Sequence, residues 1–336
     1  MSLLLAGIDE AGYGPVLGPL SVAMTLFRVE GWEPGQPAPD LWKLCKAGVC
    51  RKPADTRKRI AVDDSKKLKL PNDSPDHHPL LHLEGGVLAF LAAARSQADG
   101  WWVPATDAEL FEAVGCGVEP HAWYAGQAQP APVAVARDQV GIRANMVRRG
   151  LSQGRTSVLA LRCEVVGEER FNRVLDEHGT KAAATAAAVR AHLRYVWDLA
   201  ARHDPVPGGP RVVCDRQGGR TDYTGFLQEA FPEAEVVEEE RSAPRCRYHV
   251  REARTGREMS VLFMPEAESR HLPVALASML AKLVRELLMG RFNRYWCGLL
   301  PELKPTAGYR GDAWRWLREA APVITPETRR VLVRRA

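Results

Sequence analysis

The sequence of 336 residues lacks a long uninterrupted apolar segment. A membrane-spanning helix needs roughly 18 or more consecutive apolar residues. The apolar run near the start, Leu3–Ile8, is far shorter and leads directly into Asp9. It also lacks the basic residues that precede the apolar part of a secretory signal. We therefore expect a cytoplasmic protein without a membrane partner.

Cysteine is scarce and scattered along the chain. Its seven copies stand at positions 45, 50, 116, 163, 214, 246 and 297, and no two of them form a CxxC pair. The odd count and the wide spacing favour reduced thiols over a disulfide framework. Cys45 and Cys50 are close in sequence, but no second ligand pair has the spacing of a structural zinc site, so we do not expect zinc there.

A strong excess of charge of one sign is also absent. The chain has 46 Lys and Arg against 41 Asp and Glu, which gives a formal net charge of +5. This balance permits a polyanionic partner without requiring one. Hydrophobic residues make up 46% and charged residues 26%, as in an ordinary globular protein that buries a sizeable core.

Predicted strands alternate with long helices, which favours a single domain of the α/β class with a mixed sheet flanked by helices. Helices are predicted from Thr180 onward, over 273–295, and twice near the C-terminus. The segment 33–59 is expected to be a surface excursion, and 71–155, with Gly and Pro throughout, a large middle insertion. Apolar runs predict strands at 3–9, 20–29, 157–166 and 211–215, and further strands in the segments AEVVEEE and EMSVLFM.

Two of these predicted strands end on carboxylates. Asp9 and Glu10 follow the first strand, and Asp215 ends a later one, while a third acidic cluster, Pro265–Ser269, precedes the long helix. Open α/β sheets present functional groups at the carboxyl ends of their strands. Carboxylates without a neighbouring cluster of His or Cys suit Mg²⁺ or Mn²⁺, and converging carboxylates build two-metal sites for phosphoryl transfer. The alternative is that these residues are solvated or cap the next helix.

Adjacent side chains of a strand point to opposite faces of the sheet. Asp9 and Glu10 can therefore serve one site only if the strand ends or bulges between them, which the glycines that follow would allow. Farther along, the segment VDDSKKLKL, residues 62–70, places Ser65 beside Lys66 and Lys67. This second cluster is either a phosphate-binding patch or a solvated charged turn.

Five motifs in order resemble the type 2 ribonuclease H family, ribonucleases HII and HIII. GIDEAGYGPVLGP resembles the family's GIDEAGRGPxxGP, DDSKKL resembles its DSKKL, and RVVCD is similar to the strand that ends in aspartate. LPVALASMLAK is similar to the family helix that contains IAAASILAK. KPTAGYRGDAW and the later TPETRR resemble its closing KGYGTxxH and TPxHR. The resemblance covers about 1–30, 60–70, 157–220 and 260–333.

The resemblance implies a ribonuclease H-like core at about 1–30, 60–70 and 157–300, and a helical substrate-binding segment at 300–336. It also implies that Mg²⁺ or Mn²⁺ is the cofactor. Glu268 stands where the family has aspartate, and Glu266 is the neighbouring alternative. The catalytic and metal-binding carboxylates that it implies are Asp9, Glu10, Asp215 and Glu268.

Substrate contacts are implied by the same motifs. The family's GRG is GYG here, and in the family the backbone of this loop approaches the ribose 2′-OH at an RNA–DNA junction. Tyr13 loses the charge of the arginine and gains a ring that can stack on a sugar or base. The substrate-binding residues that the resemblance implies are Gly12, Tyr13, Gly14, Ser65, Lys66, Lys67, Tyr309 and Arg310.

The implied activity is metal-dependent hydrolysis of the RNA strand of RNA/DNA hybrids, by a two-metal mechanism that leaves a 5′-phosphate. Duplex DNA with a single ribonucleotide is a further candidate substrate. Two alternatives stay open: an impaired descendant that binds hybrid or structured nucleic acid without cleaving it, and a nuclease of the same fold that acts on DNA. A monomer is favoured. Trp101–Trp102 and Trp123–Tyr124 are expected to be buried in the insertion rather than to stack on bases.

Overall fold

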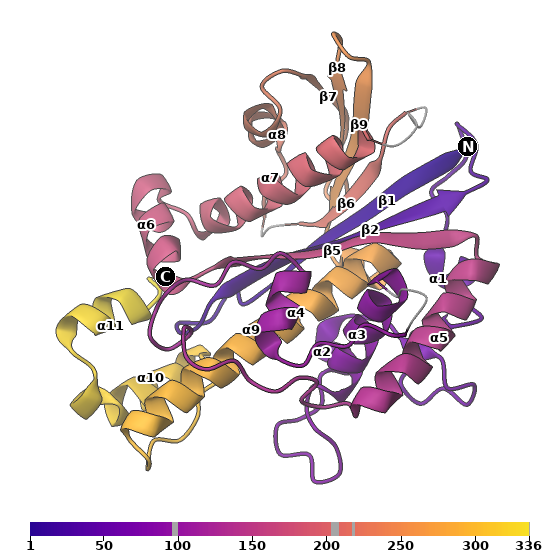
Figure 1. Ribbon diagram of the computed structural model, residues 1–336. Coiled ribbons are helices and arrows are strands. Elements are labelled where there is room, and N and C mark those ends of the chain that lie inside the picture. The colour runs from indigo at the N-terminus through magenta and orange to yellow at the C-terminus, as the bar shows by residue number, and fades with distance from the viewer. Residues whose placement is uncertain (96–99, 203–207, 217–218, 336) are drawn as a thin grey trace.

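The computed structural model describes residues 1–95, 100–202, 208–216 and 219–335. Within these residues, seven strands form one sheet in the order β5-β2-β1-β6-β9-β8-β7 (Figure 1). Strand β6 runs parallel to both of its neighbours, and the other adjacent pairs are antiparallel. The predicted mixed sheet is therefore confirmed. The strands are β1 (Ser2–Ala11), β2 (Leu20–Glu30), β5 (Thr156–Val166), β6 (Arg211–Asp215), β7 (Glu235–Arg241), β8 (Cys246–Glu252) and β9 (Arg257–Met264).

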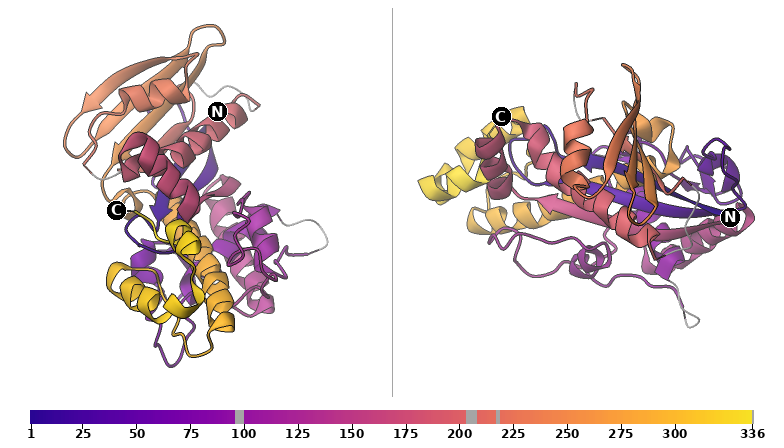
Figure 2. Two further views of the ribbon diagram at one scale, coloured as in Figure 1. Left: turned by 90° about the vertical axis from the view of Figure 1, so that its left-hand side faces the viewer. Right: turned by 90° about the horizontal axis from the view of Figure 1, so that it is seen from above.

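Helices cover both faces of the sheet, as the predicted class requires. Strand β1 is apolar on both faces, with Leu3 and Leu5 in one core and Leu4 and Ile8 in the other. The two views in Figure 2 show the sheet between its helical layers. One layer contains α3 (Leu81–Arg95), α5 (Arg137–Gln153) and α9 (Leu272–Leu299), and the other α6 (Glu168–His178), α7 (Lys181–Ala200) and α8 (Thr224–Ala230).

Helix α9 lies against the backbone of β1 because Gly7 has no side chain. A Cβ atom at Gly7 would lie 2.2 Å from the backbone nitrogen of Val274. The hydroxyl of Thr25 on β2 donates a hydrogen bond of 2.7 Å to the carbonyl of Pro273 in the first turn of the helix. These contacts fix the start of α9 over the centre of the sheet, so its next turns reach the ends of β1 and β6.

The segment 71–155 contains helices that the sequence analysis did not predict: α3, α4 (Asp107–Ala113) and α5. Gly85 and Gly86 lie inside α3, where a Cβ at Gly86 would lie 2.5 Å from the Met279 methyl of α9. Close packing against the long helix therefore explains why glycine stands at this position inside α3. Trp123 and Tyr124 are buried, while Trp101 and Trp102 are half-buried against the core.

The prediction that 33–59 is a surface excursion is wrong for its apolar residues. Helix α1 (Leu41–Leu44) buries Trp42, whose indole N–H donates to the carbonyl of Val62 at 2.9 Å. Strand β3 (Val49–Cys50) pairs with β4 (Ile60–Ala61). The hydrophobic effect draws these residues into the core although Gly and Pro separate them in sequence.

All seven cysteines are free thiols, and six of them are buried. The Cys45 sulfur lies 3.3 Å from the Thr156 hydroxyl, and the Cys50 thiol donates to the carbonyl of Lys52 at 3.3 Å. No helix among the described residues is long and apolar enough to cross a bilayer. The remaining short elements are α2 (Ser65–Leu68), η1 (Ala267–Ser269), α10 (Arg310–Glu319), η2 (Ala321–Val323) and α11 (Pro326–Leu332).

Candidate active site

A cavity of about 280 Å³ lies at the carboxyl ends of β1 and β6. Four carboxylates that the sequence analysis selected line it: Asp9, Glu10, Asp215 and Glu268. They come from β1, the end of β6 and η1, so the fold assembles them from segments that are far apart in sequence. The other lining residues are Ala11, Gly12, Tyr13, Gly14, Pro15, Asp64, Ser65, Lys66, Ser278, Lys282 and Tyr309.

Asp9 and Glu10 both line the cavity although β1 continues past them. The pairing of β1 with β2 runs without a bulge to Ala11, so the expectation of a strand end or bulge between the two acids is wrong. The pairing with β6 stops at Ile8, because β6 ends at Asp215. One edge of β1 is therefore open from Asp9 onward, and neighbouring side chains of the same strand reach the same cavity there.

Asp215 and Glu268 are brought together by the turn after β9. The backbone N–H of Ala267 in η1 donates to Asp215 Oδ1 at 3.0 Å, which places the next residue, Glu268, beside the end of β6. Glu266 has a left-handed backbone with φ of 52° and does not line the cavity. Of the two candidates for the fourth acid, the structure thus brings Glu268 to the cavity.

Burial and mutual repulsion make these acids difficult to ionise. Burial, and then the charges of Glu10 and Asp215, hold the pKa of Asp9 well above its ordinary value. Burial and the charge of Asp215 raise the pKa of Glu10 to about 8. The pKa values of Asp215 and Glu268 are also raised, again chiefly by burial. The protein thus concentrates carboxylates where negative charge is costly without a cation.

The chemistry of this donor set fits Mg²⁺ or Mn²⁺, because every candidate ligand atom is a carboxylate oxygen. As the side chains stand, no three His, Cys, Asp or Glu residues in the described part of the chain are placed to hold one metal ion. The carboxylates would have to close around an ion. The side chains that would do so are those of Asp9, Glu10, Asp215 and Glu268.

Helix α2 supplies the positive side of the cavity. The Asp64 carboxylate caps this helix by accepting from the backbone N–H of Lys66 at 2.9 Å. Ser278 of α9 donates its hydroxyl to the Ser65 hydroxyl at 3.0 Å, which ties α2 to the long helix. Lys66 lines the cavity and opposes the rise in the pKa of Glu10. Lys67 does not line it; its ammonium lies 3.4 Å from Asp63 Oδ1.

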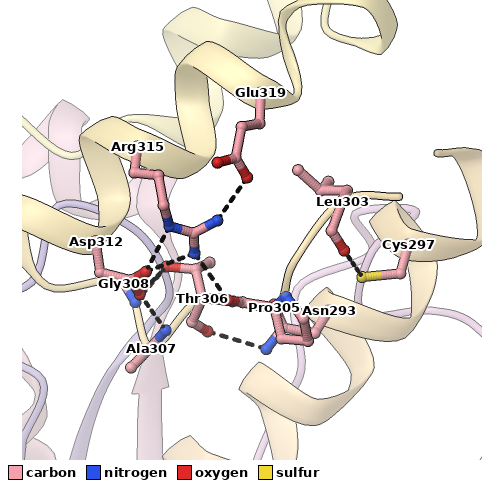
Figure 3. A network of polar contacts seen from close by, with 10 residues as sticks. All are labelled: Asn293, Cys297, Leu303, Pro305, Thr306, Ala307, Gly308, Asp312, Arg315 and Glu319. Carbon is pink, nitrogen blue, oxygen red and sulfur yellow. Dashed lines mark hydrogen bonds and ion pairs between the residues drawn. The ribbon is translucent and has the colours of Figure 1, made fainter. Parts of the chain in front are cut away.

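The connection between α9 and α10 places Tyr309 at the rim of the cavity. Asp312 accepts hydrogen bonds from the Thr306 hydroxyl at 2.6 Å and from the Ala307 N–H at 2.8 Å (Figure 3). The carbonyl of Gly308 accepts from the N–H groups of Val16 and Leu17, so this connection is joined to the loop that follows β1. Tyr309 is 47% exposed and available for stacking.

Some polar residues of the cavity were not selected from the sequence, and two selected residues, Lys67 and Arg310, lie outside it. Asp64 and Ser278 stand inside the DDSKKL and LPVALASMLAK motifs, which were the signal for them. Lys282 also lines the cavity, with its ammonium 2.8 Å from Glu286 Oε1. Arg310 begins α10 and is exposed, and it is not among the lining residues.

No family model matches the chain, and no curated protein matches it. Similar solved structures include RNase HII from Archaeoglobus fulgidus in a complex with PCNA, at 14% identity and a TM-score of 0.41, over 99% of this chain and 94% of that one. Bst-RNase HIII in complex with Mn²⁺ has 17% identity and a TM-score of 0.43, over 98% of this chain and 66% of that one. The ribonuclease H2 from Pyrococcus horikoshii OT3 has 13% identity and a TM-score of 0.39, over 99% of this chain and 93% of that one.

Proposed function

We propose that this protein is a metal-dependent endoribonuclease that hydrolyses the RNA strand of RNA/DNA hybrids, with duplex DNA containing a single ribonucleotide as a further substrate. One observation carries the proposal. Four acids chosen from sequence motifs line the same cavity as the Gly12–Gly14 loop, Ser65–Lys66 and Tyr309. Acids and nucleic-acid contacts chosen separately along the chain thus meet in one place, as hydrolysis of a phosphodiester requires.

In this proposal Asp9, Glu10, Asp215 and Glu268 hold Mg²⁺ or Mn²⁺. A pair of such ions, when bound, supplies an activated water and stabilises the leaving 3′-oxygen, which yields a 5′-phosphate. The raised pKa values of the acids support this role, because a cation at this position removes the cost of ionising them.

The chain's own residues bind and orient the nucleic acid. Lys66, whose charge acts on both Glu10 and Asp215, attracts the phosphate next to the scissile bond. Tyr13 and Tyr309 present rings at the cavity for stacking on a sugar or base. Lys67 and Arg310 lie outside the cavity and are proposed to contact phosphates farther along the duplex.

A second candidate function is binding of hybrid or structured nucleic acid without cleavage. Two observations favour it: Glu268 is one methylene longer than the family's aspartate, and no three acids in the described residues are placed to hold one ion as they stand. Mg²⁺ tolerates only a narrow range of geometry. The two candidates share the substrate and differ in whether metal-dependent cleavage follows binding.

The test uses three labelled duplexes, each with Mg²⁺ and with Mn²⁺: an RNA/DNA hybrid, DNA with one ribonucleotide, and DNA alone. We expect cleavage only at ribonucleotides, with 5′-phosphate ends, and no cleavage by the Asp9→Asn variant. Binding of the hybrid without cleavage by the wild type would favour the second candidate. Cleavage of the all-DNA duplex would favour a DNA nuclease instead. Size-exclusion chromatography of the same sample tests the proposed monomer, and fractionation of cells tests the proposed cytoplasmic location.

A further inference from the structure

Arg334 lies near the C-terminus, just after α11, yet its side chain is buried against the loop that follows β1. It is 3% exposed. The guanidinium donates to the carbonyl of Gly12 at 2.5 Å through Nη1 and to that of Tyr13 at 3.0 Å through Nη2. The backbone N–H of Arg334 donates to the carbonyl of Val16 at 2.8 Å. Arg334 thus contacts the loop after β1 near its start, at Gly12 and Tyr13, and farther along, at Val16.

The position of the guanidinium is itself fixed by α6. Its central carbon lies 3.8 Å from the centre of the Phe171 ring, a stacking distance that favours a planar cation. The Asn172 side chain donates to the carbonyl of Val333 at 2.9 Å. Figure 1 shows the C-terminus beside α6, in agreement with these contacts. Arg334 is therefore a rigid donor rather than a mobile end of the chain.

The two carbonyl contacts determine where the next two N–H groups point. In a trans peptide the N–H is directed opposite to the C=O of the same unit. Because the carbonyls of Gly12 and Tyr13 both face Arg334, the N–H groups of Tyr13 and Gly14 both face away from it. Gly12, Tyr13 and Gly14 line the cavity, whereas Arg334 does not. The two N–H groups are thus directed to the cavity side of the loop.

Burying this guanidinium is costly, so its presence calls for a reason. Burial and the nearby charge of Arg285 lower the pKa of Arg334 to about 10, which leaves it cationic at neutral pH. Glu168 gives partial compensation. Nε of Arg334 and one carboxylate oxygen of Glu168 have no hydrogen-bond partner among the described residues. A neutral apolar residue would fill this space at lower cost but would release both carbonyls.

We propose that Arg334 is a positioning residue of the candidate active site. It fixes the backbone of Gly12–Gly14 so that two adjacent N–H groups are presented to the oxygen atoms of the sugar–phosphate backbone at the cleavage point. This inference rests on the proposed function for the identity of the ligand, a ribonucleotide-containing strand. Arg334 itself does not touch the substrate.

The first test compares Arg334→Met with the wild type and with Arg254→Gln. Arg254 lies in the turn between β8 and β9 and its side chain is 87% exposed, so this control removes one positive charge away from the cavity. We expect kcat/KM on the hybrid to fall about 100-fold in Arg334→Met, mainly through kcat, because misplaced contacts at the reacting bond cost rate more than binding. The control should match the wild type.

Chemical rescue separates positioning from general loss of stability. Millimolar guanidinium added to Arg334→Ala should restore part of kcat, because the ion can occupy the vacated space and donate to the same carbonyls. Urea has a similar shape but no charge, and should restore less. Arg334→Lys, which keeps the cation but loses the second donor direction, should retain an intermediate rate, and it replaces Arg334→Met if that variant does not fold.

A readout that does not depend on nuclease activity is the rate at which chymotrypsin cuts the protein after Tyr13. Mass spectrometry follows this cut. Loss of the hydrogen bonds to the carbonyls of Gly12 and Tyr13 should make this cut about 10-fold faster in Arg334→Met at a temperature where it remains folded. The inference would be overturned if a folded Arg334→Met variant were cut by chymotrypsin, and cleaved the hybrid, at the wild-type rates. If the wild type cleaves no duplex, the proposed function fails, while the chymotrypsin comparison still decides whether Arg334 holds the loop.

Discussion

At the scale of single residues, the ionised acids of the cavity lower the stability of the folded protein. Glu10 has a pKa of about 8 when folded, against 4.5 in its ordinary state. Between these values the folded protein keeps a proton that the unfolded chain has lost, so stability falls as pH rises through this window. Such a cost is expected of acids that serve the proposed metal site rather than the stability of the fold.

Glu10→Gln tests this directly in the absence of divalent ions. At pH 8.5 the variant should melt at least about 2–4 °C higher than the wild type, because it removes a half-buried negative charge near that of Asp215. At pH 4.5 the two should melt alike, since both side chains are then neutral in the folded state. Adding Mg²⁺ should raise the Tm of the wild type more than that of the variant. Equal melting temperatures at pH 8.5 would contradict the raised pKa of Glu10.

His192 has the opposite effect on the pH dependence. It is buried in α7, its Nε2 lies 3.0 Å from the carbonyl of Val22 on β2, and burial lowers its pKa to about 4. Between pH 6.5 and 4 the unfolded chain binds a proton that the folded protein excludes, so stability falls as pH falls. The loss should approach about 3 kcal/mol across this window.

Urea denaturation at several pH values measures this contribution. His192→Gln should be less stable at pH 7 through loss of the fitted ring, but should lose less further stability on acidification to pH 4.5 than the wild type does. The matched control is His178→Gln, since His178 ends the neighbouring helix α6 and its side chain is 61% exposed. If His192→Gln loses as much stability on acidification as the wild type does, other groups cause the acid sensitivity.

At the scale of elements, the position of α9 depends on one missing side chain. In Gly7→Ala the new methyl group would lie 2.2 Å from the backbone of Val274, and neither backbone can move without disturbing the sheet. We expect a loss of at least about 1–3 kcal/mol in the free energy of unfolding, together with lower activity, because α9 carries Ser278 and Lys282 into the cavity.

The control for this variant lies in the same helix. A Cβ atom at Gly290 would have no other described atom within 4 Å outside its own helical turn, so Gly290→Ala should stabilise α9 by up to about 1 kcal/mol through helix propensity. Urea denaturation of both variants measures the contrast. Similar stability of Gly7→Ala and the wild type would show that α9 does not lie as close to β1 as the structure places it.

The elements with the strongest apolar runs were predicted, and some elements with weaker patterns were missed. Strands β1, β2, β5 and β6 and helix α9 lie where their apolar runs placed them. Helix α5 was missed although Val140, Ala144, Val147 and Leu151 form a buried stripe at helical spacing. Strand β8 was missed although its buried residues alternate. In both cases the signal was present but weak beside the polar and glycine residues around it.

At the scale of the whole molecule, the segment 71–155 is joined to the core by a buried ion pair. Arg291 of α9 donates to both carboxylate oxygens of Asp107 in α4, at 2.7 and 2.6 Å, and to the carbonyl of Tyr124 at 2.8 Å. Asp107→Ala would leave the Arg291 charge buried without its partner, at a cost of about 3–5 kcal/mol.

Because this pair connects distant parts of the chain, we expect Asp107→Ala to lower the stability of the whole molecule in one transition. Tryptophan fluorescence and far-UV circular dichroism should therefore give coincident curves. The double variant Asp107→Ala/Arg291→Met should recover part of the loss, since it removes the unpaired charge. A separate early transition at 71–155 would show instead that this segment unfolds on its own.

The sequence by itself determined the α/β class, the strands that carry acids near their carboxyl ends, and which acids were candidates for the site, because strand patterning and short motifs are local properties. Only the tertiary structure decided which residues share the cavity. It selected Glu268 over Glu266, added Asp64 and Ser278, left Lys67 and Arg310 outside, and brought Arg334 against the Gly12–Gly14 loop. Those choices depend on close packing between segments hundreds of residues apart, which no local pattern records.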